Sequence, residues 1–369
     1  MTRKMVLTWL VPSLLVPVVI VGGLFAFRDS AADRLRFLLM ARTVGMTKQQ
    51  ADHLEGNVKS DPKSFADRME LLYFYSFKKS SPDGLSPDEL ANRRQHILWV
   101  IANKPSSGFA GEPAMEFYPK DEEVDPEGLD EARKLWLVQV QTKPSDARRN
   151  HNAGEFFSSI HDYPQSEMLL ERARTIDPAA YDVTFSLATD YWHDTRYSAT
   201  SAERVTNAKK ALGMFEQALK NAHGKQERRF VLPDAAQAAL ESGDEEKATS
   251  WSKEMLGMAD QATKGEDFTD EIHYGNIVLG RIALQHGDIA AAGSYLAKAG
   301  LADGNPHLDT FGPNMMLAKE LLQKGDDKPV LAYLVSCGRF WKDDNGKLAK
   351  WRSDVTEGKM PDFGANLNY

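Results

Sequence analysis

The sequence has a single cysteine, Cys337, among its 369 residues. One thiol excludes an intramolecular disulfide framework, an all-cysteine zinc site and a c-type haem attachment motif. It does not decide the compartment, because exported proteins tolerate low cysteine content. The chain also lacks an excess of positive charge, with a formal net charge of −8 and a pI of about 5.7. Since phosphate backbones are gripped by clustered Lys and Arg, no nucleic-acid partner is expected.

The common catalytic motifs are missing as well. The sequence contains no Gly-x-Gly-x-x-Gly, no phosphate loop, no Gly-x-Ser-x-Gly elbow and no His-Glu-x-x-His. We therefore expect no cofactor, no metal and no enzyme activity. The nearest approach to a metal set is His151 and Glu155, one helical turn apart, followed by His161 and Asp162, and it lacks a third ligand in the right place. A catalytic set assembled from distant residues leaves no motif of this kind.

A long hydrophobic run occurs at the amino terminus. The pair Arg3-Lys4 precedes an uncharged stretch over residues 5–27, which at 1.5 Å per residue is long enough to cross a hydrocarbon core of roughly 30 Å. We predict a single-pass transmembrane signal-anchor over residues 1–27. A cleaved signal peptide is the alternative, because small residues stand at 30–32. The basic flank favours an N-inside orientation, with the bulk of the chain on the extracytoplasmic, periplasmic side of the membrane.

The juxtamembrane segment, residues 28–45, has two interpretations. Residues 34–42 are strongly apolar between arginines, so they either lie on the membrane surface or begin the first helical pair.

Beyond residue 45, apolar residues recur at spacings of three and four, which predicts an all-α fold. Capping residues before acidic or proline-containing first turns mark helix starts, at Thr47, Ser86 and Asp125. Prolines mark helix ends, at Pro62, Pro105, Pro144 and Pro178.

The longest irregular stretch follows the N-terminal helical pairs that we expect over residues 46–104. Residues 105–128 are rich in Gly, Pro and acidic side chains, and loops of this length are uncommon in compact domains. The stretch is either a solvated loop insertion between repeats or a docking segment that brings Phe109, Phe117 and Tyr118 to a partner.

A recurring pattern organises the C-terminal two thirds of the chain. A helix, a Gly-Asp turn and a second helix with an early alanine recur around Gly243-Asp244, Gly287-Asp288 and Gly325-Asp326. His161-Asp162 keeps the same register with His in the Gly position. Each part has a physical reason: small residues let two helices approach closely, the turn Gly accepts a positive φ, and Asp caps the next helix.

This pattern resembles the tetratricopeptide repeat (TPR), whose consensus has a small residue and an aromatic in the first helix, alanines in the second, and a closing proline. The chain is also similar to bacterial membrane-anchored TPR proteins. The spacings between successive Gly-Asp turns, 44 and 38 residues, exceed the ideal 34. We predict an irregular TPR-like α-solenoid of helical hairpins over residues 129–341, with a capping helix and tail over residues 342–369. An all-helical domain of another kind also uses Gly-Asp turns and alanine seams.

In such a solenoid, the first helices of successive hairpins build a concave wall that receives a peptide or a protein surface. The resemblance therefore implies a membrane-tethered scaffold that binds a protein or peptide partner, and assembly of an envelope complex suits an anchored array. The phase of the helices predicts nine groove residues: Arg148, His151, Glu155, Asp182, Trp192, Gln237, Tyr274, Arg281 and Lys319. The alternative is an enzyme on an all-helical scaffold, with carboxylates in the groove as acid and base.

Overall fold

The computed structural model describes residues 38–79, 84–117, 121–262 and 267–368. These residues form helices, turns and irregular segments, with no strand among them, so the predicted all-α class is confirmed. The chain divides into two compact units, unit 1 up to Pro178 and unit 2 from Ala179 onward. The boundary falls inside the region that the sequence predicted as one continuous array.

No helix in the described part of the chain is both long enough and apolar enough to span a membrane. The predicted anchor over residues 1–27 lies outside the described residues. Of the juxtamembrane segment, residues 38–43 are helical, and Leu39 and Met40 are buried in the core of unit 1. This part of the segment therefore belongs to the first helical layer of unit 1.

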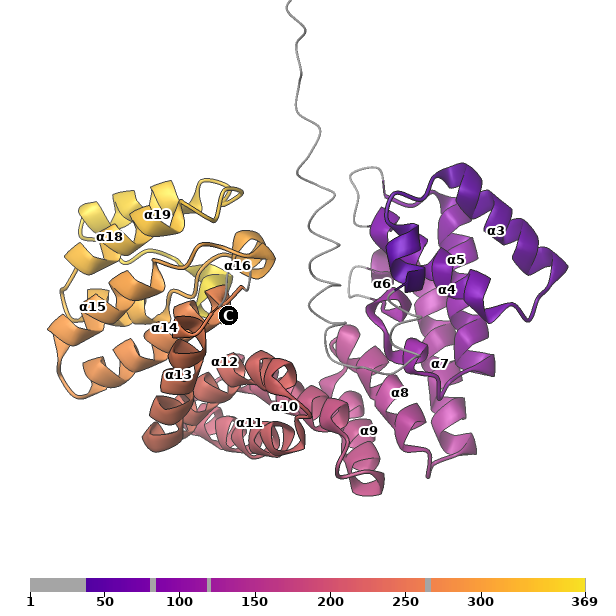
Figure 1. Ribbon diagram of the computed structural model, residues 1–369, viewed down its shortest axis with the longest axis horizontal. Helices are drawn as coiled ribbons and strands as arrows, with labels where there is room; N and C mark the ends of the chain where they lie inside the picture. Colours follow the sequence, from indigo (N-terminus) through magenta and orange to yellow (C-terminus); the bar gives the residue numbers. More distant parts are fainter. Residues whose placement is uncertain (1–37, 80–83, 118–120, 263–266, 369) are drawn as a thin grey trace, which may run out of the picture. The chain divides into compact units, whose positions relative to one another are not determined.

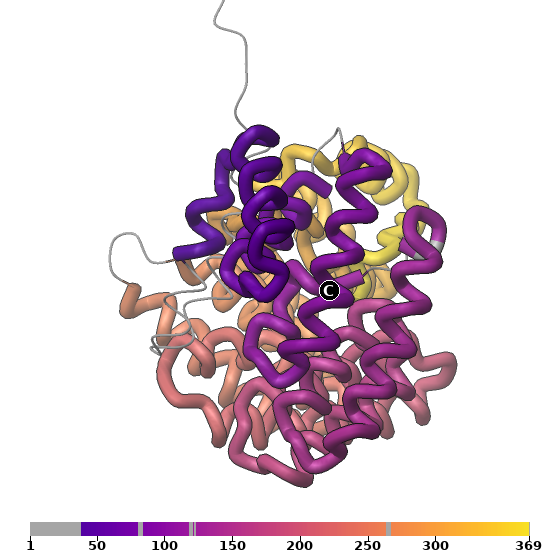
Figure 2. The backbone as a smooth tube through the Cα atoms, turned by 90° about the vertical axis from the view of Figure 1, so that its right-hand side faces the viewer, coloured from indigo at the N-terminus to yellow at the C-terminus, as the bar shows by residue number. Residues whose placement is uncertain are grey.

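After the helical residues 38–43, unit 1 contains seven further described α-helices and two short 3-10 turns. They are α3 (Lys48–Ser60), α4 (Phe65–Lys79), α5 (Pro87–Asn103), η1 (Gly108–Gly111), η2 (Pro113–Met115), α6 (Asp121–Val124), α7 (Pro126–Thr142), α8 (Ala147–Ser159) and α9 (Tyr163–Ile176). Successive long helices pack on one another, from α3 with α4 through α5 with α7 to α8 with α9, while η1 packs on α8 and η2 on α4. Figure 2 shows these helices, in indigo to magenta, running beside one another.

The predicted helix starts and ends of unit 1 are confirmed. Thr47 and Ser86 each form a capping box, and Asp125 accepts a hydrogen bond from the backbone N–H of Gly128. The helices α3, α5, α7 and α9 each end two residues before the proline that predicted their end. Local chemistry therefore sets these boundaries.

The described part of the segment over residues 105–128 is not a solvated loop. Phe109 is 2% exposed and Phe117 is fully buried, and both belong to the hydrophobic core of unit 1. The Phe109 ring packs edge-on against Tyr73 at 5.4 Å between centroids. Both interpretations of these two aromatics were wrong, because the segment fills the core instead of facing solvent or a partner. Tyr118 lies outside the described residues.

Unit 2 contains ten described α-helices and one 3-10 turn. They are α10 (Tyr181–Arg196), α11 (Ser201–Asn221), α12 (Lys225–Ser242), α13 (Glu245–Asp260), α14 (Thr269–Gln285), α15 (Ile289–Ala299), α16 (Pro306–Phe311), α17 (Met316–Gln323), α18 (Lys328–Cys337), α19 (Lys347–Thr356) and η3 (Gly364–Leu367). Figure 1 shows α10 to α19 as successive hairpins, from magenta to yellow.

The four predicted hairpin turns have one common geometry. Gly243, Gly287 and Gly325 have φ between 81° and 88°, and His161 has φ of 61°. At each turn the N–H of the following Asp donates to the carbonyl five residues before it, as in a Schellman motif. Three of these aspartates, those after Gly243, Gly287 and His161, also cap the next helix. The register predicted for the turns is therefore confirmed, including the substitution of His for Gly.

Glycines in two first helices allow close hairpin contacts. A Cβ on Gly154 of α8 would lie 2.7 Å from the Leu170 side chain of α9, and a Cβ on Gly280 of α14 would lie 3.0 Å from Tyr295 of α15. Because real Cβ atoms almost never approach so closely, each glycine fixes the distance between its two helices.

Candidate functional site

The first helices of the hairpins in unit 2 pack against one another. Helix α12 contacts α10 and α14, and α14 contacts α17, while α11, α13 and α15 pack on the first helices before them. This arrangement gives the first helices a shared inner face. Four charged side chains of unit 2 interact on it, and we call them the inner charge cluster: Arg196, Asp234, Asp270 and His307.

His307 and Asp270 form the one direct ion pair within the cluster. His307 Nδ1 lies 3.1 Å from Asp270 Oδ1, and Asn305 Nδ2 donates to Asp270 Oδ2 at 3.0 Å. Asn305 also caps α16 by accepting from Leu308 N at 2.9 Å, which fixes the start of α16 beside the first turn of α14. The His307 and Asp270 side chains are 43% and 31% exposed. The pair is therefore accessible to a ligand.

The pKa values of the ion pair move apart. Burial lowers the pKa of His307, but the hydrogen bond with Asp270 and the negative charges of Asp270 and Asp234 together raise it above its ordinary value. Burial raises the pKa of Asp270, and the hydrogen bonds from His307 and Asn305 together with the charge of His307 lower it below its ordinary value. Each net shift favours the charged form of its group.

Asp234 of α12 behaves in the opposite way. Burial raises the pKa of Asp234, and the negative charge of Asp270 adds to that rise. Arg196, His307 and the indole of Trp192 act in the opposite direction without outweighing burial. The charges of Arg196 and His307 act on Asp234 through space, whereas Asp270 has a direct contact with His307. Two neighbouring carboxylates therefore differ in proton affinity.

The C-terminal tail, residues 361–368, begins on the last helix of unit 2. Trp351 Nε1 of α19 donates to Asp362 O at 2.9 Å, and the Phe363 ring packs against Trp351 at 5.1 Å between centroids. Phe363 is buried in the core of unit 2 together with Leu348, Trp351 and Val355. These residues therefore join the last helix to the core of unit 2, and their role as the cap of a repeat array stays a prediction.

From Phe363 the tail continues to the inner face. Asn366 is fully buried, and its Nδ2 donates to Phe311 O and to Pro313 O, both at 3.0 Å. The carbonyl of Asn366 accepts from Met315 N at 2.8 Å. Arg196 Nη1 of α10 then donates to Asn368 O at 2.9 Å. The tail thus connects the last helix of unit 2 to its first.

A buried polar network holds the segment between α16 and α17, to which the tail binds. Asn314 N donates to His273 Nε2 at 3.1 Å, so Nδ1 carries the proton and donates to Ala299 O at 3.3 Å. Burial lowers the pKa of His273 to about 4, which keeps the ring neutral at pH 7. Asn314 Nδ2 donates to Gln237 Oε1 at 3.4 Å. The tail-binding segment is therefore fixed to both α12 and α14.

Three of the predicted groove residues lie beside this site. The Arg196 guanidinium lies 5.7 Å from the centre of the Trp192 ring, and the Tyr274 ring lies 6.2 Å from that of His307. Gln237 contacts Asn314, as described above. All three side chains are at least nine-tenths buried, so they form the floor of the site.

The other predicted groove residues of unit 2 lie elsewhere. Asp182 is half-buried on the first turn of α10, where Oδ1 accepts from Val183 N at 3.1 Å. Lys319 is half-buried on α17. Arg281 is 9% exposed and is held between Glu241 and Glu320 by hydrogen bonds of 2.7 to 3.1 Å.

Arg148, His151 and Glu155 belong to unit 1, on α8. Arg148 Nη1 lies 3.2 Å from His151 Nδ1, and His151 Nε2 lies 3.3 Å from Glu155 Oε1. His151 is 6% exposed. The structure therefore brings these three residues together, in a different unit from the inner charge cluster. Within the described residues no group of three or more His, Cys, Asp or Glu side chains is arranged to hold a metal ion.

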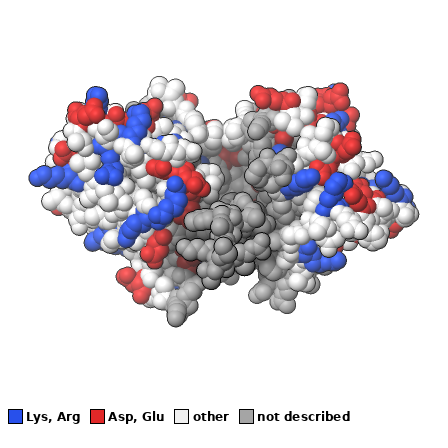
Figure 3. Space-filling model, turned by 90° about the horizontal axis from the view of Figure 1, so that it is seen from above, with Lys and Arg blue, Asp and Glu red and all other residues white. Residues whose placement is uncertain are grey.

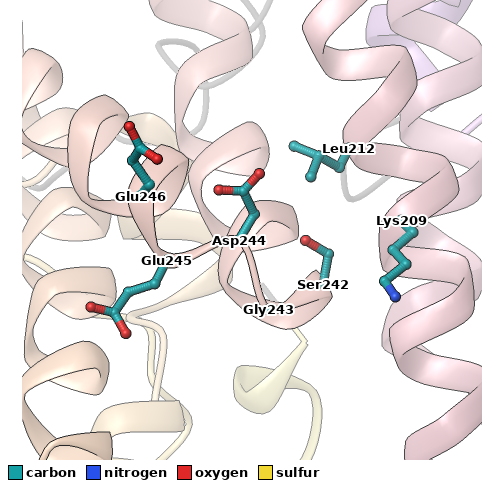
Figure 4. A pocket seen from close by; sticks show the side chains of 7 residues that line it. All are labelled: Lys209, Leu212, Ser242, Gly243, Asp244, Glu245 and Glu246. Carbon is teal, nitrogen blue, oxygen red and sulfur yellow. The ribbon is translucent and has the colours of Figure 1, made fainter.

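A surface cavity of about 500 Å³ lies between α11 and the turn from α12 to α13. Figure 4 shows Lys209 and Leu212 on one wall and the turn residues on the other. Asp244 of this turn accepts from Lys247 N at 3.1 Å and from Lys247 Nζ at 2.5 Å, so its carboxylate is used by its own helix cap. The cavity is open, and its shape follows from the hairpin turn. Figure 3 shows basic and acidic side chains intermixed on the surface of each unit that is seen there.

The sequence did not indicate Arg196, Asp234, Asp270, His307 or Asn366. Three of them lie one helical turn from a predicted groove residue: Arg196 from Trp192, Asp234 from Gln237, and Asp270 from Tyr274. Extending the predicted inner face by one turn on α10, α12 and α14 would have included all three.

The chain was compared with protein-family models and with curated proteins. No protein-family model matches the chain, and no curated protein matches it either.

Proposed function

We propose that this chain is a TPR-like scaffold, tethered to a membrane by residues 5–27, that binds a short protein segment on the inner face of unit 2. The repeated hairpins with their Gly-Asp turns support the TPR likeness, and the uncharged run of residues 5–27 supports the tether. Assembly of an envelope complex on the periplasmic side suits such an array.

One observation carries the proposal. The inner face of unit 2 already holds a short segment of polypeptide, the C-terminal tail, through hydrogen bonds from Met315 N and Arg196 to tail carbonyl oxygens. Hydrogen bonds to main-chain atoms give affinity for a bound segment whatever most of its side chains are, as in the addition of a peptide strand to a sheet. The side chains of His307 and Asp270 are partly exposed, so a bound partner can contact these two charged groups.

Crosslinking in intact membranes tests the proposal. Proteins attached to the intact chain are identified and then compared between Asp270→Lys and Asp260→Lys. Both changes reverse one charge; Asp270 belongs to the inner charge cluster, and Asp260 is exposed at the end of α13. We expect Asp270→Lys to abolish capture of the partner and Asp260→Lys to preserve it, with cooperative melting of both chains. Equal capture of the partner by the two variants would contradict the proposal that the partner binds the inner face of unit 2.

The enzyme alternative has one observation in its favour. Asp234 and Asp270 have pKa values that are shifted in opposite directions, and such a division is what a general acid and a general base require. To decide between enzyme and scaffold, the hydrolysis of glycosidic, ester and phosphate substrates is measured for the purified chain and for its Asp234→Asn variant. A turnover that depends on Asp234 would favour the enzyme over the scaffold.

A further inference from the structure

Beyond Phe363 the tail is held by the buried Asn366 side chain, by hydrogen bonds to the carbonyl oxygens of Asn366 and Asn368, and by Leu367, which packs against the core of unit 2. Phe363 is 2% exposed in the core, whereas Gly364 and Ala365 are exposed and Leu367 and Asn368 are half-buried. Asn366 is the one fully buried side chain among residues 364–368. A segment with so little buried surface opens at low free energy while the rest of the unit stays folded. Residues 364–368 can therefore leave their site without unfolding unit 2.

The pocket around Asn366 selects a side chain that donates hydrogen bonds, as the NH2 group of a carboxamide does, over a carboxylate. Nδ2 faces two backbone carbonyl oxygens, Phe311 O and Pro313 O, both at 3.0 Å. A carboxylate of the same shape has no proton to donate, so it would place a negative charge against two acceptors. Burial would then leave that charge without a partner, which is strongly unfavourable.

Gly312 makes room for this side chain. Its φ is 84°, and a Cβ there would lie 2.8 Å from Asn366 Nδ2 and 2.6 Å from the Trp341 ring. Any other residue at this position would collide with the occupant of the pocket and with its wall. The segment between α16 and α17 is therefore shaped around a bound carboxamide.

We propose that residues 364–368 are a resident ligand of this pocket, and that the partner segment carries an asparagine whose side chain replaces that of Asn366. This inference rests on the proposed function and names the chemistry of its partner. The partner's main chain then takes the hydrogen bonds that Met315 N and Arg196 give to the tail.

A tail peptide tests the pocket without the natural partner. The probe is a fluorescent peptide with the sequence of residues 363–369, and the receptor is the chain ending at Phe363, in detergent, after its cooperative melting has been checked. We expect the shortened chain to bind the peptide and the intact chain to bind it about tenfold more weakly. The reason is that a tethered tail competes at an effective concentration on the order of 1 mM, about ten times a peptide Kd of roughly 0.1 mM.

Two altered peptides provide the matched control. Aspartate at the position of Asn366 should abolish binding, whereas aspartate at the position of Asn368, which contributes its backbone oxygen, should leave the affinity within a few-fold. As a second route, Asn366→Asp in the full-length chain should release the tail and raise the affinity for the unaltered peptide to that of the shortened chain.

Failure of the peptide to bind either folded receptor, or equal binding of the two aspartate peptides, overturns the inference. The outcome is separate from that of the proposed function. If a partner is captured in membranes but the peptide does not bind, the proposed scaffold function stands and the proposed Asn366 pocket fails. If the peptide binds but no partner is captured, the pocket stands and the scaffold function fails.

Discussion

Helices α12 and α14 carry charged side chains at two places, and the two places differ in how fully the charges are paired. Nearer their C-terminal ends, Glu241 accepts from Arg204 Nε at 2.6 Å and from Arg281 Nη1 at 2.7 Å, and Arg281 also bonds Glu320. We call Arg204, Glu241, Arg281 and Glu320 the closed ion network. Nearer their N-terminal ends, the same two helices carry Asp234 and Asp270 of the inner charge cluster.

The difference appears in the proton affinities of the two α12 carboxylates. Burial alone would raise the pKa of Glu241, but Arg281 and Arg204 outweigh it and lower the value to about 2. At Asp234 burial prevails, and the pKa rises. Because its charges are fully paired, the closed ion network stabilises the packing of the helices. Asp234 is desolvated without such pairing, and binding sites often contain a carboxylate of this kind although it lowers the stability of the fold.

The largest effect is expected from breaking the closed ion network. Arg281→Leu leaves Glu241 with one cation and Glu320 without its buried partner, and should lower the free energy of unfolding by about 3–5 kcal/mol. Arg196→Leu, the control from the inner charge cluster, removes one hydrogen bond to the tail and should cost about 1 kcal/mol. Equilibrium denaturant unfolding measures both. Equal losses would contradict the distinction between the two sites.

Neutral amides at the two α12 carboxylates should change stability with opposite signs. At pH 7, Glu241→Gln should cost about 3–4 kcal/mol, since the pKa is lowered from 4.5 to about 2 and each unit of depression is worth about 1.4 kcal/mol. That contribution is present above pH 4.5 and is lost as pH falls toward about 2. Asp234→Asn should raise the melting temperature at pH 7, because a raised pKa means that the folded state disfavours the charged form. The same sign for both variants would contradict the comparison.

The hairpin register on which both sites depend is tested by two alanines. Ala292 is fully buried on α15, facing α14, and Ala292→Leu should overpack this contact and cost about 1–3 kcal/mol. Ala262 is exposed after α13, so Ala262→Leu should change stability little. Thermal melting of the two variants should separate them; identical melting temperatures would mean that the register is wrong.

The smallest effect concerns the pH dependence of the ion pair in the inner charge cluster. Its stabilisation is complete above the ordinary pKa of Asp270, 3.8, and below that of His307, 6.5. It is lost as pH rises through the raised pKa of His307, or falls through the lowered pKa of Asp270. The melting temperature of His307→Gln should therefore differ most from the unaltered chain between about pH 4 and 6.5. A difference that grows above pH 8 would contradict this pairing.

The sequence predicted what local chemistry determines. The turns at Gly243, Gly287 and Gly325 follow from residues that are adjacent in the chain, and His161 adopts the same positive φ because the Asp after it and the flanking helices keep the motif. The segment from 105 to 128 was misjudged because Gly, Pro and acidic residues indicate a loop, whereas burial of Phe109 and Phe117 depends on tertiary packing.

The candidate site was predicted in part. Helical phase identified Trp192, Gln237 and Tyr274, which line it, but also Arg281, which its neighbours on α12 and α17 enclose. Helical phase alone does not show that Glu241 and Asp234, two carboxylates on α12, differ in how they are paired with cations. The contacts of Asn366 with Phe311 and Pro313 join residues more than 50 positions apart, and no pattern in the sequence indicates them.

The central claim, that a partner segment binds the inner face of unit 2, is tested most directly by photo-crosslinking at two positions in intact membranes. A photoreactive residue replaces Phe311, 43% exposed beside His307, or Val335, 56% exposed on the second helix α18. We predict a protein adduct from position 311 and none from position 335. Adducts of equal yield from both positions, or an adduct from position 335 alone, would contradict the claim.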